Sequence, residues 1–200
     1  MLRDTLKPGM TKSEVEQFLQ GKGNYVQIDH LSRFLKEPIA LDTKKFIFLK
    51  LATLYEKARM LNDAAKMYDN AAGLSIAFVE KIKHYMKETE LYAKMGAFDR
   101  VEQAIKKAMA QANSREGEEI KTSVKIFYKE QAKICEAEVR RNQATRFYEK
   151  ILEMRISEQE RKEIKEKLLE LYKKLGKIHE YQTLEKSIPS SSKDEVGFKY

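Results

Sequence analysis

Residues that break helices or cross-link chains are scarce in this sequence. Its 200 residues include only three prolines, eight glycines and one cysteine. Proline and glycine mark turns and irregular segments, so few regular elements are forced to end. Strand-like alternation of polar and apolar residues is also absent over any useful length, and we therefore expect an all-α fold. A single cysteine excludes an internal disulfide framework and fits a reducing compartment.

Residue patterns that carry catalysis or bind cofactors are missing too. His30, His84 and His179 lie in different segments without a second His or Cys at metal-ligand spacing, so we expect no metal site and predict surface or groove positions. The segment 21–23 lacks the strand and the Lys-Ser or Lys-Thr pair of a phosphate-binding loop. Cys135 replaces a tyrosine on an apolar stripe, which favours a buried residue over a nucleophile. We expect neither an enzyme nor a cofactor.

Long apolar runs are absent as well. The residues Met1-Leu2-Arg3-Asp4 are followed by charge and Pro8 rather than by an apolar core. This start predicts no signal peptide, and the rest of the chain predicts no membrane span. We therefore expect a cytoplasmic protein.

What the sequence does contain is a helical pattern that repeats. The pattern is clearest over 48–71, where two amphipathic helices follow one another. The second is rich in alanine, which lets two helices approach closely while aromatic rings fill the space beside them. Asn62 and Asp63 predict the start of the second helix, and Gly73 predicts a left-handed cap at its end. The stretch is typical of a tight antiparallel hairpin.

Three later segments repeat this layout. Alignment on the stripe residue before each turn gives periods of 37, 43 and 37 residues, from Tyr55, Tyr92, Cys135 and Tyr172. Units of this length that cannot bury their own apolar faces indicate a stacked solenoid. We predict the third turn at Arg141-Asn142 and a loop or a helix extension over 111–119 for the longer period. Ser157 with Glu160 predicts a capping box in the last unit.

The order of small, aromatic and turn residues resembles the tetratricopeptide repeat (TPR) over about 45–189. The first unit matches the family best, through Ala52, Tyr55, Ala64, Tyr68 and Ala71. It departs from the family at Arg59, which stands where the turn glycine is expected. Periods above the usual 34 residues match the longer-period variants of the family. The resemblance implies a right-handed superhelical stack of about four hairpins, a TPR-like α-solenoid. We place them in residues 41–188, at about 41–77, 78–114, 115–156 and 157–188.

Short segments flank the array. In residues 1–40, Thr11 with Glu14 predicts a capping box for one short helix, and a second helix is predicted from about 25 to 36. We predict that this pair caps the array, and a separate docking element is the alternative. Residues 189–200 have little apolar content and are predicted to form a flexible tail. The alternative is that they dock in a groove through Val196, Phe198 and Tyr200.

Positive charge is the main surface feature. The formal net charge is +8 and the isoelectric point is near 9.3, which favours acidic partners. First helices line the concave face of TPR arrays, so the resemblance puts three sets of side chains there. The first is a lysine ladder spaced four residues apart, Lys121, Lys125, Lys129 and Lys133. The other two are Lys83 with Lys87, and Phe46 with Leu49 and Thr53. A solvated helix face is the plain alternative for the ladder.

Two functions fit these features. The first is a non-enzymatic scaffold or adaptor whose groove binds an extended or helical segment of another, acidic protein. The alternative is a basic RNA- or ribosome-associated protein that uses the lysine ladder on phosphates, which would give binding a steep salt dependence. The sequence, however, lacks the interleaved exposed aromatic residues and the arginine enrichment that are typical of proteins that bind nucleic acids. Self-association is compatible with either function.

Overall fold

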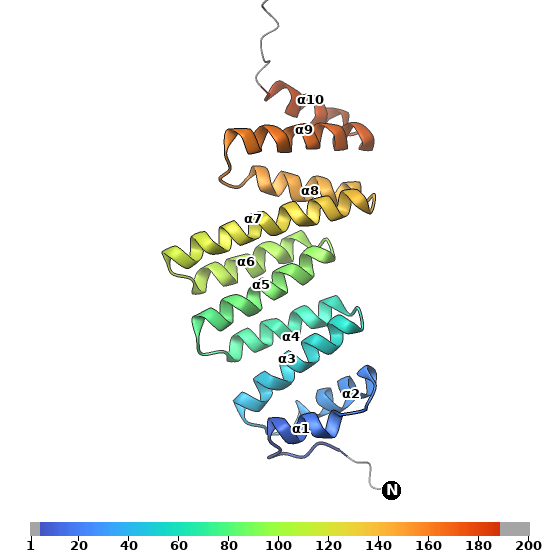
Figure 1. Cartoon of the computed structure of the whole chain (residues 1–200), viewed down its shortest axis with the longest axis vertical. Coiled ribbons are helices and arrows are strands. Elements are labelled where there is room, and N and C mark those ends of the chain that lie inside the picture. Colours follow the sequence, from blue (N-terminus) through green and yellow to red (C-terminus); the bar gives the residue numbers. More distant parts are fainter. Residues whose placement is uncertain (1–4, 189–200) are drawn as a thin grey trace, which may run out of the picture. The chain divides into compact units, whose positions relative to one another are not determined.

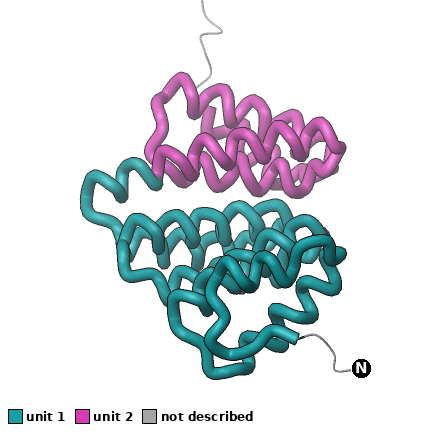
Figure 2. Tube along the Cα trace, turned by 60° about the horizontal axis from the view of Figure 1, so that its bottom comes forward, with its two compact units in different colours: residues 1–120 teal, residues 121–200 magenta. Residues whose placement is uncertain are grey.

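The computed structural model describes residues 5–188, where every regular element is an α-helix (Figure 1). The all-α prediction is therefore confirmed for this range. The helices are α1 (Lys12–Leu19), α2 (Asn24–Phe34), α3 (Leu41–Lys57), α4 (Leu61–Leu74), α5 (Phe78–Lys94), α6 (Phe98–Gln111), α7 (Ser114–Ala137), α8 (Arg141–Leu152), α9 (Glu158–Leu175) and α10 (Ile178–Lys186). They belong to two compact units, residues 1–120 (unit 1) and residues 121–200 (unit 2), shown in Figure 2. Helix α7 crosses the boundary, and each unit is described by itself.

Four helix-to-helix turns share one backbone geometry. In each, one residue adopts a left-handed conformation with φ between 60 and 72°, and these residues are Arg59, Gly96, Val139 and Gly176. The next N–H donates a hydrogen bond of 2.8 to 2.9 Å to the carbonyl five residues earlier. This is the Schellman motif, which satisfies carbonyls that the end of a helix leaves free.

The carbonyls that accept these bonds belong to the residues on which the repeats align. They are those of Tyr55, Tyr92, Cys135 and Tyr172. The spacing of 37, 43 and 37 residues therefore reproduces a real backbone register, and not only a similarity of side chains.

The turn geometry corrects three predictions. The third turn is centred on Val139, two residues before Arg141-Asn142. Helix α4 begins at Leu61, so Asn62 and Asp63 lie in its first turn and do not cap it, because the Schellman turn already fixes the helix start. Gly73 lies inside α4, which continues to Leu74, and its φ is not positive.

The longer middle period comes from a helix extension. Helix α7 has 24 residues, whereas α3 and α5 have 17 each. Its start is fixed by a capping box, in which Asn113 Oδ1 accepts from the Glu116 N–H and Glu116 Oε2 accepts from the Asn113 N–H. Of the two explanations for residues 111–119, the helix extension is the one that the structure shows.

The short N-terminal helices pack against α3. Thr11 and Glu14 form the predicted capping box of α1. Side chains from α1, α2, α3 and the segment before α1 share one buried cluster, Leu6, Val15, Leu19, Leu31, Phe34, Ile47, Leu51 and Leu54. The N-terminal helices therefore contribute to the core of unit 1, and their role as a cap of the array stays a prediction.

The rest of unit 1 consists of packed helix pairs. Helix α3 packs on α4, α4 on α5, and α5 on α6. The alanines that α4 contributes are fully buried, and the buried Tyr68 donates a hydrogen bond of 2.8 Å to Glu56 of α3. His84 is buried as well and stacks on Tyr68, with ring centroids 6.2 Å apart. The surface position predicted for His84 is wrong, because the aromatic side chain of the neighbouring hairpin covers it.

Unit 2 repeats this packing. Tyr128 of α7 contacts Phe147 of α8 with ring centroids 5.7 Å apart, and α9 packs on both α8 and α10. Cys135 is buried, as predicted, and burial raises the pKa of its thiol. The Ser157 side chain accepts from the Glu160 N–H and so caps α9. The Glu160 side chain binds lysines of α7 instead of completing the predicted box.

Candidate partner-binding surface

The apolar candidates of unit 1 lie on α3. Phe46 is half-buried and packs against the N-terminal core cluster, so much of its ring is already covered by the cap. Leu49 is partly exposed, and Thr53 is exposed with its hydroxyl donating to the Lys50 carbonyl at 2.8 Å. Leu49 and Thr53 therefore offer more free surface than Phe46 does.

The two lysines predicted on α5 differ in their surroundings. Lys83 is exposed, and within residues 5–188 it has no ion pair. Lys87 binds Glu90 at 2.9 Å, and Lys94 binds the same carboxylate at 2.6 Å. The hydrogen bond with Glu90 raises the pKa of Lys87. Lys87 is thus held by its own helix, while Lys83 is available to a partner.

The lysine ladder lies on α7 within unit 2 and is partly neutralised. Lys125 and Lys129 both bind Glu160 of α9, at 3.3 and 2.5 Å. The Lys129 and Lys125 ammonium groups hold the pKa of Glu160 below its usual range, Lys129 contributing most. Lys121 and Lys133 are exposed, and Lys133 has no ion pair within the described part of the chain. The ladder is therefore not one continuous free edge.

A hollow of about 350 Å³ opens beside the ladder. Its lining includes Lys129 and Lys133 of α7 and, from α9, three glutamates, one lysine and one isoleucine, Glu163, Glu166, Glu170, Lys167 and Ile164. Tyr148 of α8 also lines the hollow and is mostly buried. Its hydroxyl is hydrogen-bonded to Glu136, and burial, followed by this carboxylate, raises the pKa of Tyr148 above its ordinary value. The hollow therefore combines an uncharged aromatic side chain with lysines from α7 and a mainly acidic set of side chains from α9.

The glutamates that line the hollow could have been found from the repeat period. Glu166 follows Lys129 by 37 residues, and Glu170 follows Lys133 by 37 residues. The lysines and the glutamates therefore occupy equivalent positions in neighbouring hairpins. None of these glutamates is among the residues predicted from the sequence to bind a partner. The nine predicted residues fall in two units, five in unit 1 and four in unit 2, and their joint groove stays a prediction.

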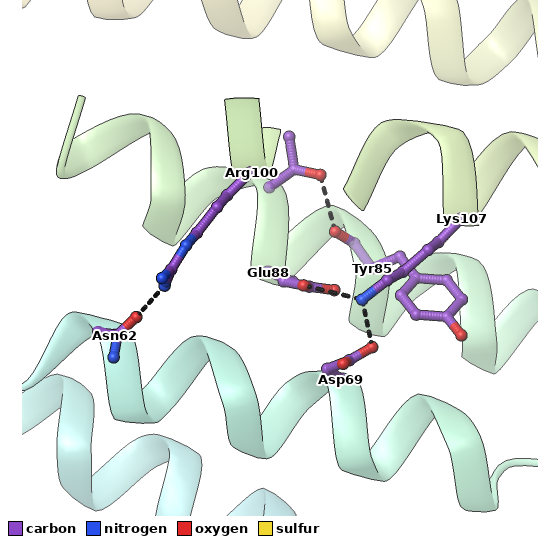
Figure 3. A network of polar contacts seen from close by, with 7 residues as sticks. Asn62, Asp69, Tyr85, Glu88, Arg100 and Lys107 are labelled. Atoms are coloured by element: carbon purple, nitrogen blue, oxygen red, sulfur yellow. Dashed lines mark hydrogen bonds and ion pairs between the residues drawn. The ribbon is translucent and has the colours of Figure 1, made fainter. Parts of the chain in front are cut away.

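A second polar cluster ties three helices of unit 1 together (Figure 3). Lys107 of α6 contacts Asp69 of α4 at 2.7 Å and Glu88 of α5 at 3.2 Å, and its ammonium lies 5.6 Å from the centroid of the Tyr85 ring. In the same view Arg100 of α6 donates to Asn62 of α4. These contacts join three consecutive helices, and the bonds between α4 and α6 link residues 38 positions apart.

Glu88 is the unusual member of this cluster. Its side chain is almost fully buried, and its Oε2 has no hydrogen-bond partner among the described residues. Burial raises the pKa of Glu88 to about 7, the Asp69 carboxylate adds to the rise, and Lys107 opposes it. A perturbed carboxyl of this kind can mark a reactive site. Here its contacts run between helices, and we interpret the cluster as a structural tie.

Within residues 5–188 no group of three or more His, Cys, Asp or Glu side chains could hold a metal ion. In the same range no helix is both long enough and apolar enough to cross a bilayer.

Comparisons with known proteins add little. The chain matches no protein-family model and no curated protein sequence. Among solved structures it is similar to the crystal structure of BtubC (BKLC) from P. vanneervenii, with 14% identity and a TM-score of 0.40. That alignment covers 94% of this chain and 87% of BtubC. A likeness of this strength carries no functional inference.

Proposed function

We propose that this chain is a non-enzymatic protein-interaction scaffold of the TPR-like type. In this proposal about four antiparallel hairpins stack in a right-handed superhelix behind the N-terminal cap, and first helices present the binding surface. Support comes from the four equivalent Schellman turns and from the alanine-lined pairs they connect. An extended or helical segment of another protein is the ligand.

The hollow of unit 2 carries the proposal. It combines a partly apolar floor at Tyr148 with lysines on α7 and glutamates on α9. Polar groups arranged around an apolar floor fix the orientation of a ligand while burial supplies affinity. Lysines on α7 and mainly acidic side chains on α9 favour a segment that carries both signs of charge.

Ion pairs within the chain leave only some charged side chains near the hollow available to a partner. Glu160 forms ion pairs with both Lys125 and Lys129. Neither Lys133 nor Glu166 has an ion pair in residues 5–188. We therefore expect an acidic residue of the partner to contact Lys133 and a basic residue to contact Glu166.

The same arrangement favours a protein over RNA as the ligand. A phosphate backbone that followed the ladder would meet Glu160, which binds Lys125 and Lys129, and the three glutamates of α9 that line the hollow. Those carboxylates repel phosphates, whereas a polypeptide can place its lysines or arginines beside them. The protein scaffold is therefore the function that the charges support best.

A peptide-selection experiment tests the scaffold. A displayed library of 12-residue peptides is panned on the full chain, and selected peptides are measured by fluorescence anisotropy. We expect sequences that combine acidic and basic residues. Lys133→Glu should weaken their binding about tenfold, which corresponds to about 1.4 kcal/mol. The double variant Lys133→Glu with Glu166→Lys should select peptides with the reverse order of charges.

Lys106→Glu is the matched control, since it makes the same charge change on an exposed position of α6 in unit 1. It should leave peptide affinity within about twofold. Selection of no peptide above background would contradict the scaffold, as would peptides whose affinity ignores Lys133→Glu. Tight binding of a poly(U) oligonucleotide that Lys133→Glu abolishes would favour the RNA function instead.

A further inference from the structure

Four highly exposed apolar side chains of unit 1 lie at the starts of α3 and α5 and in the connection that leads into α5. Ile76 in the α4–α5 connection is 94% exposed, and Phe78 and Val79 in the first turn of α5 are 61% and 68% exposed. Leu41, the first residue of α3, is 68% exposed. We call these four residues the apolar tip. Exposed apolar groups of this size, clustered and not scattered, mark an interaction surface.

Well-defined contacts hold the tip in place. Ser75, the residue before Ile76, is buried, and its hydroxyl donates to the Ala71 carbonyl at 3.0 Å. Lys45 of α3 binds Glu80 of α5 at 2.9 Å, which joins the first turns of the two helices. Figure 1 shows both helix starts on the same side of unit 1. The apolar side chains therefore project from a fixed frame.

Free lysines form a second layer behind the tip. Lys44 follows Leu41 by three residues, Lys81 follows Phe78 by three, and Lys83 follows Val79 by four, so each lysine lies one helical turn (about 5 Å) inward on the same face. Helical side chains lean toward the N-terminus, which directs these lysines back toward the tip. The Lys81 ammonium lies 5.6 Å from the centroid of the Phe78 ring.

The acids nearby are already neutralised. Asp42 binds Lys12 at 2.5 Å, and Glu80 binds Lys45. None of Lys44, Lys81 and Lys83 has an ion pair with a residue in 5–188. The first turn of α5 also lacks a side-chain cap, so the positive end of its dipole adds to the field. The surroundings of the apolar tip therefore have an excess of positive charge.

We propose that the apolar tip docks this protein peripherally on an anionic lipid surface. Ile76, Phe78, Val79 and Leu41 enter the boundary between headgroups and acyl chains, and the three lysines behind them contact lipid phosphates. The order of the layers matches that of a bilayer, where apolar side chains lie deepest and long basic side chains extend to the headgroups.

The charges favour lipid over a second copy of the chain as the occupant. Two tips packed about a two-fold axis would bring two sets of unpaired lysines together, and like charges repel at such an interface. A flat anionic bilayer instead neutralises all of them at once. This inference is independent of the hollow in unit 2, because no residue of the apolar tip lines that hollow.

Vesicle sedimentation tests the proposal with the full chain. We expect it to sediment with vesicles of phosphatidylcholine and phosphatidylserine, and much less with phosphatidylcholine alone. Ile76→Ser with Phe78→Ser should weaken binding to the mixed vesicles at least tenfold. Each of Lys81→Gln and Lys83→Gln should weaken it about fivefold and reduce its salt dependence, since a lysine near an anionic surface contributes about 1 kcal/mol.

A controlled depth measurement uses the absence of tryptophan from the sequence. The emission of Phe78→Trp should shift to the blue on mixed vesicles, whereas that of Ile178→Trp, at an equally exposed site in unit 2, should not. Ile178→Ser should leave sedimentation unchanged. Failure of the unmodified chain to bind mixed vesicles would overturn the proposal. The proposal would also be overturned if a tip variant abolished self-association in analytical ultracentrifugation without changing vesicle binding, because the tip would then contact a second copy of the chain and not lipid.

Discussion

The residue with the greatest conflict between side chain and backbone is Val139. Its φ is 60°, in the left-handed region that β-branched residues rarely adopt, because the side chain then crowds the following carbonyl. Gly96 and Gly176 occupy the equivalent turns at φ of 72 and 68° and have no side chain to crowd. The repeat therefore demands this conformation even where the sequence does not favour it.

Val139→Gly is accordingly expected to stabilise the protein. Relief of a cost of about 1–2 kcal/mol outweighs the extra freedom that glycine gives the unfolded chain, so we expect a gain of roughly 1 kcal/mol. Gly176→Val should lower stability by a similar or larger amount, although a Cβ there meets no atom within 4 Å. Urea unfolding followed by circular dichroism measures both. A lower midpoint for Val139→Gly would show that strain at this turn is not what we describe.

At the scale of helices, unit 1 is tied by a buried carboxyl. Glu88 of α5 meets Lys107 of α6, which also binds Asp69 of α4. Burial raises the pKa of Glu88 from 4.5 to about 7, so the folded protein holds this proton more tightly than the unfolded chain does. The stability that results is fully present below pH 4.5 and is lost as the pH rises from 4.5 through 7.

Glu88→Gln should remove this pH dependence. The neutral amide imitates the protonated carboxyl, so the variant should match the unmodified protein near pH 5 and exceed it near pH 8. Between pH 5 and pH 8, the free energy of unfolding of the variant relative to the unmodified protein should rise by roughly 3 kcal/mol at most. One pKa unit corresponds to about 1.4 kcal/mol. Urea unfolding at pH 5, 6, 7 and 8 measures this rise. Glu37→Gln, at an exposed position between α2 and α3, is the control and should leave the pH dependence unchanged.

At the scale of the whole molecule, the chain divides into two compact units, each with buried apolar side chains. Phe147 and Ile151 of unit 2 are fully buried, as are Ile47 and Leu51 of unit 1. In arrays of repeats, each unit contacts its neighbours only, so damage to one core acts locally. Stability should therefore vary along the chain.

Phe147→Ala tests this expectation. Loss of its buried ring should cost roughly 3–5 kcal/mol within unit 2. Hydrogen exchange should then accelerate for amides of α8 and α9 while amides of α3 and α4 keep their protection. Leu51→Ala provides the reciprocal control in unit 1. Equal acceleration in both units after either substitution would show that the chain opens as one cooperative body.

The sequence by itself determined the helical class, the register of the turns and the nature of the core. Those features are local, because a stripe at three- and four-residue spacing specifies its own buried face. The periods of 37, 43 and 37 residues, the capping box at Thr11 and the burial of Cys135 could all be read in this way.

Only the tertiary structure decided which charges are free and which apolar groups are left uncovered. Lys125 is neutralised by Glu160, 35 residues away, while Lys133, on the same ladder, is not. Glu88 is buried although its helix is rich in charge, and Ile76 is exposed although it is apolar. Such outcomes depend on the rotation and register of one helix against the next. A local pattern shows which side a helix buries, but only packing shows what lies opposite each side chain.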